Sequence, residues 1–346
     1  MKILVVRYGT IGDCIFASAF YRELRKNYPD AQIDALVDKV SMGVMEHCPY
    51  IDNLVYVPRV RRKYLDFFYY YPILRQYDKV YFPKNDATFT LFSYIAGIKE
   101  RIGFHLARNK HLTLSVSYTE TKHERDYYLD LLRAQDLEIT SDKLEIWRDE
   151  EAKPKIKDIL DKTLQQGQRS VLIQAFSRFT AKNWLNAYWA ELIRYLSDEL
   201  DMQVYFSGGK KDTRHYRQIY KLLDKSGGLK YRPVDMSGKL TISETTELIN
   251  NMDLVISVDS CSIHIAAGLN IPSVLIHGST SLLRWLPLSK KCVIASKNYW
   301  CSPCALQSGT KKFCKRKVPK CMKNLLPCDV ISMLPIKKEE KIPVSL

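Results

Sequence analysis

The stretch MKILVVRYGTIGDCIF, residues 1–16, decides the fold class. Its apolar, β-branched run from Ile3 to Val6 predicts a buried parallel strand. A tight turn, Gly9-Thr10-Ile11-Gly12-Asp13, follows, and a helical pattern runs from Cys14 to Lys26. In a doubly wound α/β domain, ligands bind where the first strand ends. Because glycines allow close backbone approach and a helix N-terminus favours an anion, we expect a ligand-binding turn here.

Asp13 has two interpretations at this position. Its spacing suits a helix N-cap, which is a purely structural role. A carboxylate repels a phosphate, so the functional interpretation is a catalytic base beside the crevice. The residues alone leave both interpretations open.

Length and composition indicate two ordinary domains. The chain has 346 residues, 46% of them hydrophobic, which is enough for two domains of about 150 residues each. No stretch approaches the roughly 20 apolar residues that a membrane span needs. Because the N-terminus is already a core strand without a basic segment before it, we expect a cytoplasmic protein with no signal peptide.

The net charge of +15 predicts anionic partners. Nucleic acid, acidic substrates and the anionic face of a membrane all fit such a charge. The sequence carries no RNA-binding, helix-turn-helix or zinc-finger signature, so we do not expect nucleic acid as a partner. A glycine-rich dinucleotide fingerprint and a P-loop lysine are also missing, which argues against a dehydrogenase and an ATPase.

Strand and helix patterns alternate through both halves of the chain, which predicts two mostly parallel sheets covered by helices. The boundary is expected near residue 155, in a charge-rich stretch from Thr140 to Gln168 without a clear core strand. Two α/β domains in tandem imply an interdomain cleft, a common place for a ligand. The predicted strands are 3–6, 33–37, 53–57, 79–82, 101–104, 170–174, 203–206, 253–257 and 273–276.

The segment Arg59 to Tyr71, RVRRKYLDFFYYY, combines four basic residues with a dense aromatic run. It fits an ordinary helix whose aromatic side chains pack into the core. It also fits an interfacial helix with cations on lipid phosphates and aromatic rings at the headgroup boundary.

Two segments of the second half follow predicted strands and suit a phosphate. Asp259 to His264, DSCSIH, opens a helix with small polar residues, whose N–H groups and dipole favour an anion. Asp259 could accept a hydrogen bond from a ribose or sugar hydroxyl, and His264 could donate to a phosphate. Ser177 to Trp184, SRFTAKNW, offers Lys182 to a diphosphate. The structural alternatives are a capped helix with a satisfied histidine and a solvated loop lysine.

Nine cysteines are many for this length, and five of them fall between Cys301 and Cys328. A C-x-x-C pair with two further thiols could hold Zn²⁺, with Cys301, Cys304, Cys314 and Cys321 as ligands. The spacing fits no common zinc module, so we favour free thiols in a basic loop and expect no metal. The surrounding cations form the densest positive patch in the sequence: Lys311, Lys312, Lys315, Arg316, Lys317, Lys320 and Lys323.

The chain resembles glycosyltransferase family 9, the family of the ADP-heptose:lipopolysaccharide heptosyltransferases. Four features carry the resemblance in order along most of the chain. They are the opening strand with its G-T-I-G-D turn, Lys182-Asn183-Trp184, D-S-C-S-I-H-I-A-A from Asp259 to Ala267, and Gly278 to Pro287 followed by C-S-P-C and Cys321-Met322.

The resemblance implies a GT-B fold, in which two Rossmann-like domains face a central cleft. Residues 1–155 would bind the acceptor and residues 156–330 the nucleotide sugar, with 331–346 as a C-terminal tail. It also implies an inverting transfer that needs no cofactor or metal, from an ADP-heptose-like donor to an anionic glycolipid, with peripheral contact at the inner-membrane surface. The family's base falls on Asp13, with Lys182 as the second catalytic residue. The expected substrate-binding residues are Gly9, Thr10, Gly12, Ser177, Asp212, Leu240, Asp259, Ser260, Cys261 and His264.

Two positions depart from the family pattern and keep alternatives open. Cys261 stands where the family usually has glycine, and Lys210 and Lys211 stand where an acidic residue usually holds the nucleoside. Both changes concern donor binding. The alternatives are a transferase that uses a non-heptose nucleotide sugar and a non-catalytic protein that binds a nucleotide sugar.

Overall fold

The computed structural model describes residues 1–57, 63–105, 110–304, 314 and 318–336. The chain divides into two compact units. Unit 1 comprises Met1–Trp147 and the short segment Leu283–Leu286, and unit 2 comprises Arg148–Leu282 and Pro287–Leu346. No helix among the described residues has the length and apolar character needed to cross a membrane.

Unit 1 is built on a six-stranded parallel sheet in the order β3-β2-β1-β4-β5-β6. Residues 3–6 of β1 are fully buried, because helices cover both faces of a doubly wound sheet and leave no polar side. The strands are β1 (Lys2–Val6), β2 (Gln32–Val37), β3 (Asn53–Tyr56), β4 (Lys79–Phe82), β5 (Glu100–Phe104) and β6 (Leu114–Val116).

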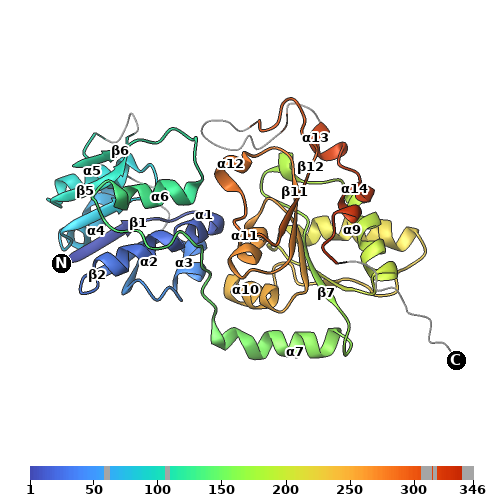
Figure 1. The fold of residues 1–346 in the computed structure, drawn as a ribbon. Coiled ribbons are helices and arrows are strands. Elements are labelled where there is room, and N and C mark those ends of the chain that lie inside the picture. The colour runs from blue at the N-terminus through green and yellow to red at the C-terminus, as the bar shows by residue number, and fades with distance from the viewer. Residues whose placement is uncertain (58–62, 106–109, 305–313, 315–317, 337–346) are drawn as a thin grey trace. The chain divides into compact units, whose positions relative to one another are not determined.

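The helices of unit 1 begin at polar caps that the sequence supplies. Asp38 forms a capping box at α3, Asp86 accepts from the backbone at the start of α5, and His123 does the same at α6. The helices are α1 (Ile11–Phe16), α2 (Ser18–Asn27), α3 (Lys39–Met45), α4 (Lys63–Leu74), α5 (Ala87–Ile95), α6 (Glu124–Arg133) and, mostly within the Leu283–Leu286 segment, α12 (Leu282–Trp285). They are labelled in Figure 1.

Unit 2 repeats this architecture. Its parallel sheet has the order β12-β11-β10-β7-β8-β9, which is the same winding read from the other edge. The strands are β7 (Ser170–Gln174), β8 (Gln203–Phe206), β9 (Val234–Asp235), β10 (Leu254–Val258), β11 (Ser273–His277) and β12 (Cys292–Ser296). The helical elements are η1 (Glu150–Ala152), α7 (Lys153–Thr163), η2 (Thr180–Lys182), α8 (Asn186–Arg194), η3 (Tyr195–Glu199), α9 (Asp212–Lys225), α10 (Ile242–Asn250), α11 (Cys261–Gly268), α13 (Lys320–Lys323) and α14 (Pro327–Ser332).

The unit boundaries differ from the sequence expectation at both places. The division falls between Trp147 and Arg148 rather than near residue 155, because α7 packs against α10 of unit 2. The expected tail from residue 331 begins inside α14, and Leu334 is still buried in the core of unit 2. Ile156 and Leu334 are buried, and ion pairs of Arg148 with Glu247 and of Lys155 with Glu244 also attach the first segment to unit 2.

The winding of each sheet marks where a ligand would bind. In unit 1 the chain runs outward from β1 to β3 on one side and from β4 to β6 on the other, so β1 and β4 flank the reversal. In unit 2 the corresponding neighbours are β7 and β10, paired through Gln174 and Ser257. Ligands of open α/β sheets bind outside the carboxyl ends of these two central strands. The segments that follow β1, β4, β7 and β10 are therefore the candidate site.

Candidate active site

The turn after β1 places Asp13 inside a helix. Gly9 has φ +124°, a conformation that favours glycine. Thr10 is the N-cap of α1, with extended backbone, and Asp13 lies in the first helical turn. The interpretation of Asp13 as the N-cap is therefore wrong, because the helix begins at Ile11, before the predicted start at Cys14. A carboxylate in the first turn is favoured by the helix dipole.

Arg7 and Thr10 hold the Asp13 carboxylate. An Nη2 atom of Arg7 lies 2.7 Å from Oδ2 of Asp13, and the Thr10 hydroxyl donates to the same oxygen at 2.6 Å. The Arg7 side chain is 5% exposed, against 26% for Asp13. Arg7 also donates to the Tyr128 hydroxyl at 3.2 Å and to the Tyr8 carbonyl at 2.8 Å. A fixed guanidinium therefore orients a carboxylate that still reaches solvent.

A second segment at this switch point follows β4. Asp86 accepts from the Tyr8 hydroxyl at 2.5 Å and caps α5 through the Phe89 N–H at 3.0 Å. The Lys84 ammonium lies 3.4 Å from the centre of the Tyr8 ring. Burial lowers the pKa of Lys84, and the negative charge of Asp86 offsets only part of that effect. Sequence reasoning missed Arg7, Lys84 and Asp86, although the switch-point rule selects them once the strand order is known.

Buried charges anchor α6, which carries Tyr128. Arg284 of α12 pairs with Glu124, and it lies 2.9 Å from Glu120 through Nη1. His123 contacts the Leu286 carbonyl at 3.0 Å through Nε2. These contacts explain why Leu283–Leu286 belongs to unit 1. They also fix the start of α6, whose Tyr128 hydroxyl accepts a hydrogen bond from Arg7.

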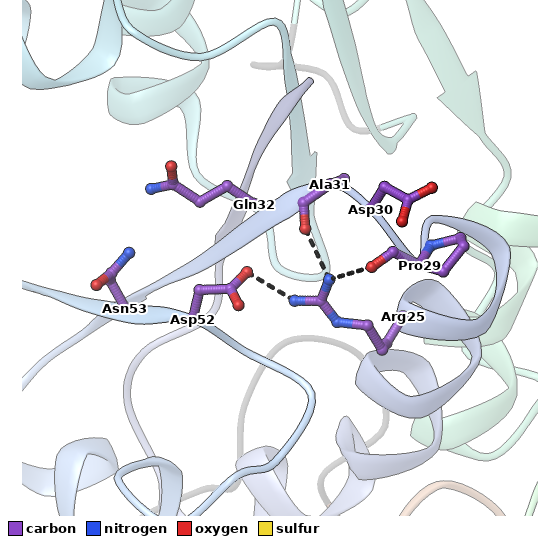
Figure 2. Close-up of a pocket in the computed structure, with 7 residues that line it drawn as sticks. All are labelled: Arg25, Pro29, Asp30, Ala31, Gln32, Asp52 and Asn53. Carbon is purple, nitrogen blue, oxygen red and sulfur yellow. Dashed lines mark hydrogen bonds and ion pairs between the residues drawn. The ribbon is translucent and has the colours of Figure 1, made fainter.

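A pocket of about 440 Å³ in unit 1 lies at the amino ends of the strands, whereas the candidate site lies at their carboxyl ends (Figure 2). Residues at the beginnings of β2 and β3 line this pocket. The Arg25 guanidinium points at its three partners there, donating to the carbonyls of Pro29 and Ala31 and pairing with Asp52 at 2.6 Å. Because these groups satisfy one another away from the carboxyl ends of the strands, we interpret the pocket as a structural junction.

In unit 2, Asp259 gathers three side chains directly after β10. Its Oδ2 lies 2.7 Å from the Lys182 ammonium and accepts from the Thr280 hydroxyl at 2.6 Å. Its Oδ1 lies 3.6 Å from Nε2 of His264. Burial by itself raises the pKa of Asp259, but Lys182 and His264 together lower it well below its usual range. The carboxylate is therefore ionised and holds the lysine at the end of η2.

The start of α11 adjoins this cluster. Ser260 is the N-cap, and its hydroxyl contacts the Ser257 hydroxyl at 3.0 Å and makes no capping bond. Among the described residues, the buried Ser262 hydroxyl finds no hydrogen-bond partner. The first N–H groups of a helix lack partners inside it and attract anions. The helix begins at Cys261, before the predicted Ile263, so the half-buried Cys261 stands in this first turn.

The other predicted donor-binding residues lie on nearby loops. The Ser177 N–H donates to the Asn183 side chain at 2.8 Å. Asp212 accepts from the Gly209 N–H at 2.8 Å, and burial raises its pKa. Burial raises the pKa of the Cys261 thiol. Leu240 is half-buried just before the capping box of α10.

The cysteines form no disulfide in the structure as described. Within the described ranges, no three His, Cys, Asp or Glu side chains are grouped so that they could hold a metal ion. That finding covers Cys301, Cys304, Cys314 and Cys321, which were considered as zinc ligands. Of the basic residues around them, Lys311, Lys312, Lys315, Arg316 and Lys317 lie outside the described residues, as do Arg59 to Arg62.

The fold and the two switch points define a class of protein. Two doubly wound α/β units in tandem are the architecture of the GT-B fold, and this chain has that fold. Its family match and its curated relatives make it a glycosyltransferase.

Comparisons with known proteins identify the family. The family model described as glycosyltransferase family 9 (heptosyltransferase) matches residues 73–313, so the chain belongs to that family. It is 26% identical to lipopolysaccharide heptosyltransferase 2 of Escherichia coli, over 84% of this chain and 86% of that protein. Lipooligosaccharide heptosyltransferase 2 of Haemophilus ducreyi is 25% identical over 85% and 88%. The structure of E. coli ADP-heptose lps heptosyltransferase II superposes with a TM-score of 0.76 at 22% identity, over 96% and 97% of the two chains.

Proposed function

We propose that this protein is an inverting, metal-independent heptosyltransferase. It moves a heptose from an ADP-heptose-like donor to a lipopolysaccharide core or a similar glycolipid, at the cytoplasmic face of the inner membrane. The observation that carries the proposal is the contrast between the two switch points. Unit 1 has a carboxylate held by Arg7 and Thr10, whereas unit 2 has Lys182 and a helix start.

The donor diphosphate is assigned to unit 2. Lys182 supplies a positive charge, and the N–H groups of the first α11 turn supply hydrogen-bond donors. Asp259 acts through Lys182, because it is buried and both of its oxygens are engaged by neighbouring side chains. This arrangement supports a positioning role for Asp259. Its expected contact with a ribose or sugar hydroxyl stays a prediction.

The acceptor is assigned to unit 1, where Asp13 removes the proton from the attacking hydroxyl. The acceptor oxygen forms a bond to the anomeric carbon as the bond from that carbon to the diphosphate oxygen breaks. The proton goes to the Asp13 carboxylate, and the electron pair leaves with the nucleotide diphosphate. Attack opposite the leaving group inverts the anomeric configuration.

Charge stabilisation accounts for metal independence in this proposal. Negative charge builds on the leaving diphosphate, and in this proposal Lys182 and the N–H groups at the α11 N-terminus stabilise it. A preorganised donor of this kind typically contributes a factor of about 100 to 1,000 in rate. Lys182 replaced by Met should therefore lower the rate of transfer by that order.

The second candidate is a transferase for another nucleotide sugar, or a protein that binds a nucleotide sugar without catalysis. The observation that favours it is Cys261, whose side chain occupies the first turn of the helix that would receive the diphosphate. Lys210 and Lys211 precede α9 where an acidic residue is usual for the family.

The test is a donor screen followed by a transfer assay. The purified protein is melted with ADP-heptose, UDP-glucose and GDP-mannose, because a ligand that binds the native state raises the melting temperature. Transfer to a lipopolysaccharide-core acceptor is then followed by nucleotide release and by NMR of the new anomeric centre, with and without EDTA. The proposal predicts stabilisation by ADP-heptose, an inverted product and full activity in EDTA. Donor binding without release of ADP would favour the non-catalytic alternative, and loss of activity in EDTA would remove metal independence.

A further inference from the structure

Helix α4 presents aromatic side chains on two faces. Tyr70 and Leu74 are buried, and the Phe67 ring packs against Phe92 at 5.2 Å. Phe68 and Tyr69 of the same helix remain 73% and 55% exposed. One stripe of the helix therefore packs into the core, as the first sequence interpretation expects, and the other stripe is exposed; the interfacial interpretation stays a prediction.

Helix α5 packs beside α4 and adds to the exposed stripe (Figure 1). We call the exposed apolar side chains of both helices the α4–α5 face. The helices have 12 and 9 residues, yet they carry six of the sixteen exposed large apolar side chains among the described residues. Such a concentration marks an interaction surface. The face consists of Phe68, Tyr69, Tyr71, Leu91, Tyr94 and Ile95.

The charges around the α4–α5 face are mainly positive. Arg75 and Lys99, at the ends of the two helices, are exposed. The Arg101 guanidinium lies 5.4 Å from the centre of the Tyr94 ring. Of the nearby acidic groups, Asp66 is half-buried, and Glu100 pairs with Lys79 at 3.0 Å although its side chain is 54% exposed. In the sequence, Arg59, Arg61 and Arg62 precede the helix, and Lys63 is its first residue.

We propose that the α4–α5 face docks on the surface of an anionic lipid bilayer. Phenylalanine, tyrosine and isoleucine side chains enter the boundary between headgroups and acyl chains, and the surrounding arginines and lysines contact lipid phosphates. The excess of cations selects an anionic bilayer over a protein partner, whose interface would need matching acidic groups. The biological purpose, delivery of unit 1 to a lipid-linked acceptor, rests on the proposed function. The binding itself does not.

The experiment is co-sedimentation of the full chain with vesicles. One set contains phosphatidylethanolamine and phosphatidylglycerol, and the other contains phosphatidylcholine alone. The test variant is Phe68→Ser/Tyr69→Ser/Tyr94→Ser, and its matched control in unit 2 is Leu222→Ser/Trp300→Ser/Val318→Ser, three side chains that are also exposed. Circular dichroism and melting temperature establish that both variants fold.

The wild type and the control should bind the phosphatidylglycerol vesicles, and binding should weaken with salt. The test variant should lose at least about tenfold in partitioning, since each side chain removes apolar area from the membrane contact. Equal binding of wild type and test variant would overturn the proposal, as would equal binding to both lipid sets. If the wild type does not bind vesicles but forms a dimer at high concentration, and the test variant alone loses this dimer, the face would be assigned to contact with a second copy.

A lipid-free assay separates this proposal from the proposed function. Binding of ADP-heptose is measured by calorimetry in the absence of vesicles, where the α4–α5 face has no role. Normal donor binding with lost vesicle binding contradicts only the docking proposal. Normal vesicle binding without donor binding contradicts only the proposed function.

Discussion

Replacement of Asp259 by Asn tests the buried cluster of unit 2. The substitution keeps the size of the side chain and removes its charge, which leaves the Lys182 ammonium without its ionic partner. The side chains of Lys182 and Asp259 are only 12% and 10% exposed, so solvent can compensate little of the loss. Removing one partner of a buried ion pair costs about 3–5 kcal/mol. We expect the free energy of unfolding of unit 2 to fall by that amount.

The dependence on pH has a definite sign. The pKa of Asp259 is lower in the folded protein than its usual value, so the folded state binds the proton less readily than the unfolded chain. The ionised carboxylate therefore stabilises the protein above the unfolded pKa of about 3.9, and this stabilisation is lost as the pH falls below that value. The difference between wild type and Asp259→Asn should be constant near neutral pH and shrink below about pH 4.

The assay is native-state hydrogen exchange of the β10 amides, which reports the opening of unit 2 by itself. The control is Asp158→Asn, because Asp158 pairs with Lys162 at the same distance of 2.7 Å but the two side chains are 59% and 70% exposed. An exposed pair contributes about 0–1 kcal/mol. The reasoning would be refuted if Asp259→Asn cost no more than Asp158→Asn at neutral pH.

Three further substitutions probe unit 1. Arg7→Met should move the acid limb of the pH profile of kcat upward, because an adjacent cation favours the ionised form of the Asp13 carboxylate. Arg7→Lys should restore most of that shift, and an unmoved limb in Arg7→Met would show that Arg7 does not act on Asp13. Gly9→Ala should destabilise the protein by about 1–3 kcal/mol through backbone strain at positive φ. Steric clash adds nothing to this cost, because the added Cβ would meet only a side-chain nitrogen of Arg7, at 3.9 Å. An unchanged denaturation midpoint would contradict the prediction. Arg284→Met should cost about 3–5 kcal/mol, because it leaves the buried Glu124 carboxylate without its ionic partner and with only the Tyr118 hydroxyl. Hydrogen exchange in α6 should become faster, and unaltered exchange there would show that the anchor is dispensable.

The sequence predicted the central strands of both sheets because these are uninterrupted apolar runs. β4 and β8 have the predicted bounds, and β1 differs by one residue. The strands β6, β9 and β12 at the sheet edges were not predicted. All three are mostly half-buried, and β6 and β9 are only 3 and 2 residues long. Helix α7 was also missed, since its charged residues hid the single buried Ile156 that packs it on unit 2.

The candidate site was predictable where a residue lies in the loop or first helical turn that follows a strand. Lys182, Asp259 and His264 were chosen by that position, and the structure places the side chains of Lys182 and His264 beside Asp259. Residues that act through distant partners could not be found this way. Arg7 contacts Tyr128 across 121 positions of sequence, and Thr280 contacts Asp259 from the turn after β11. Such contacts depend on strand order and helix packing, which a local pattern does not contain.

The most direct test of the central claim is the transfer rate of Asp13→Asn with ADP-heptose and a lipopolysaccharide-core acceptor, beside its donor affinity by calorimetry. The amide keeps the shape of the side chain and cannot accept the acceptor's proton as a base. We predict that the rate falls by several orders of magnitude while donor affinity stays nearly intact, because the diphosphate is assigned to unit 2. A variant that transfers heptose at the wild-type rate would remove Asp13 from the role of base and contradict the account.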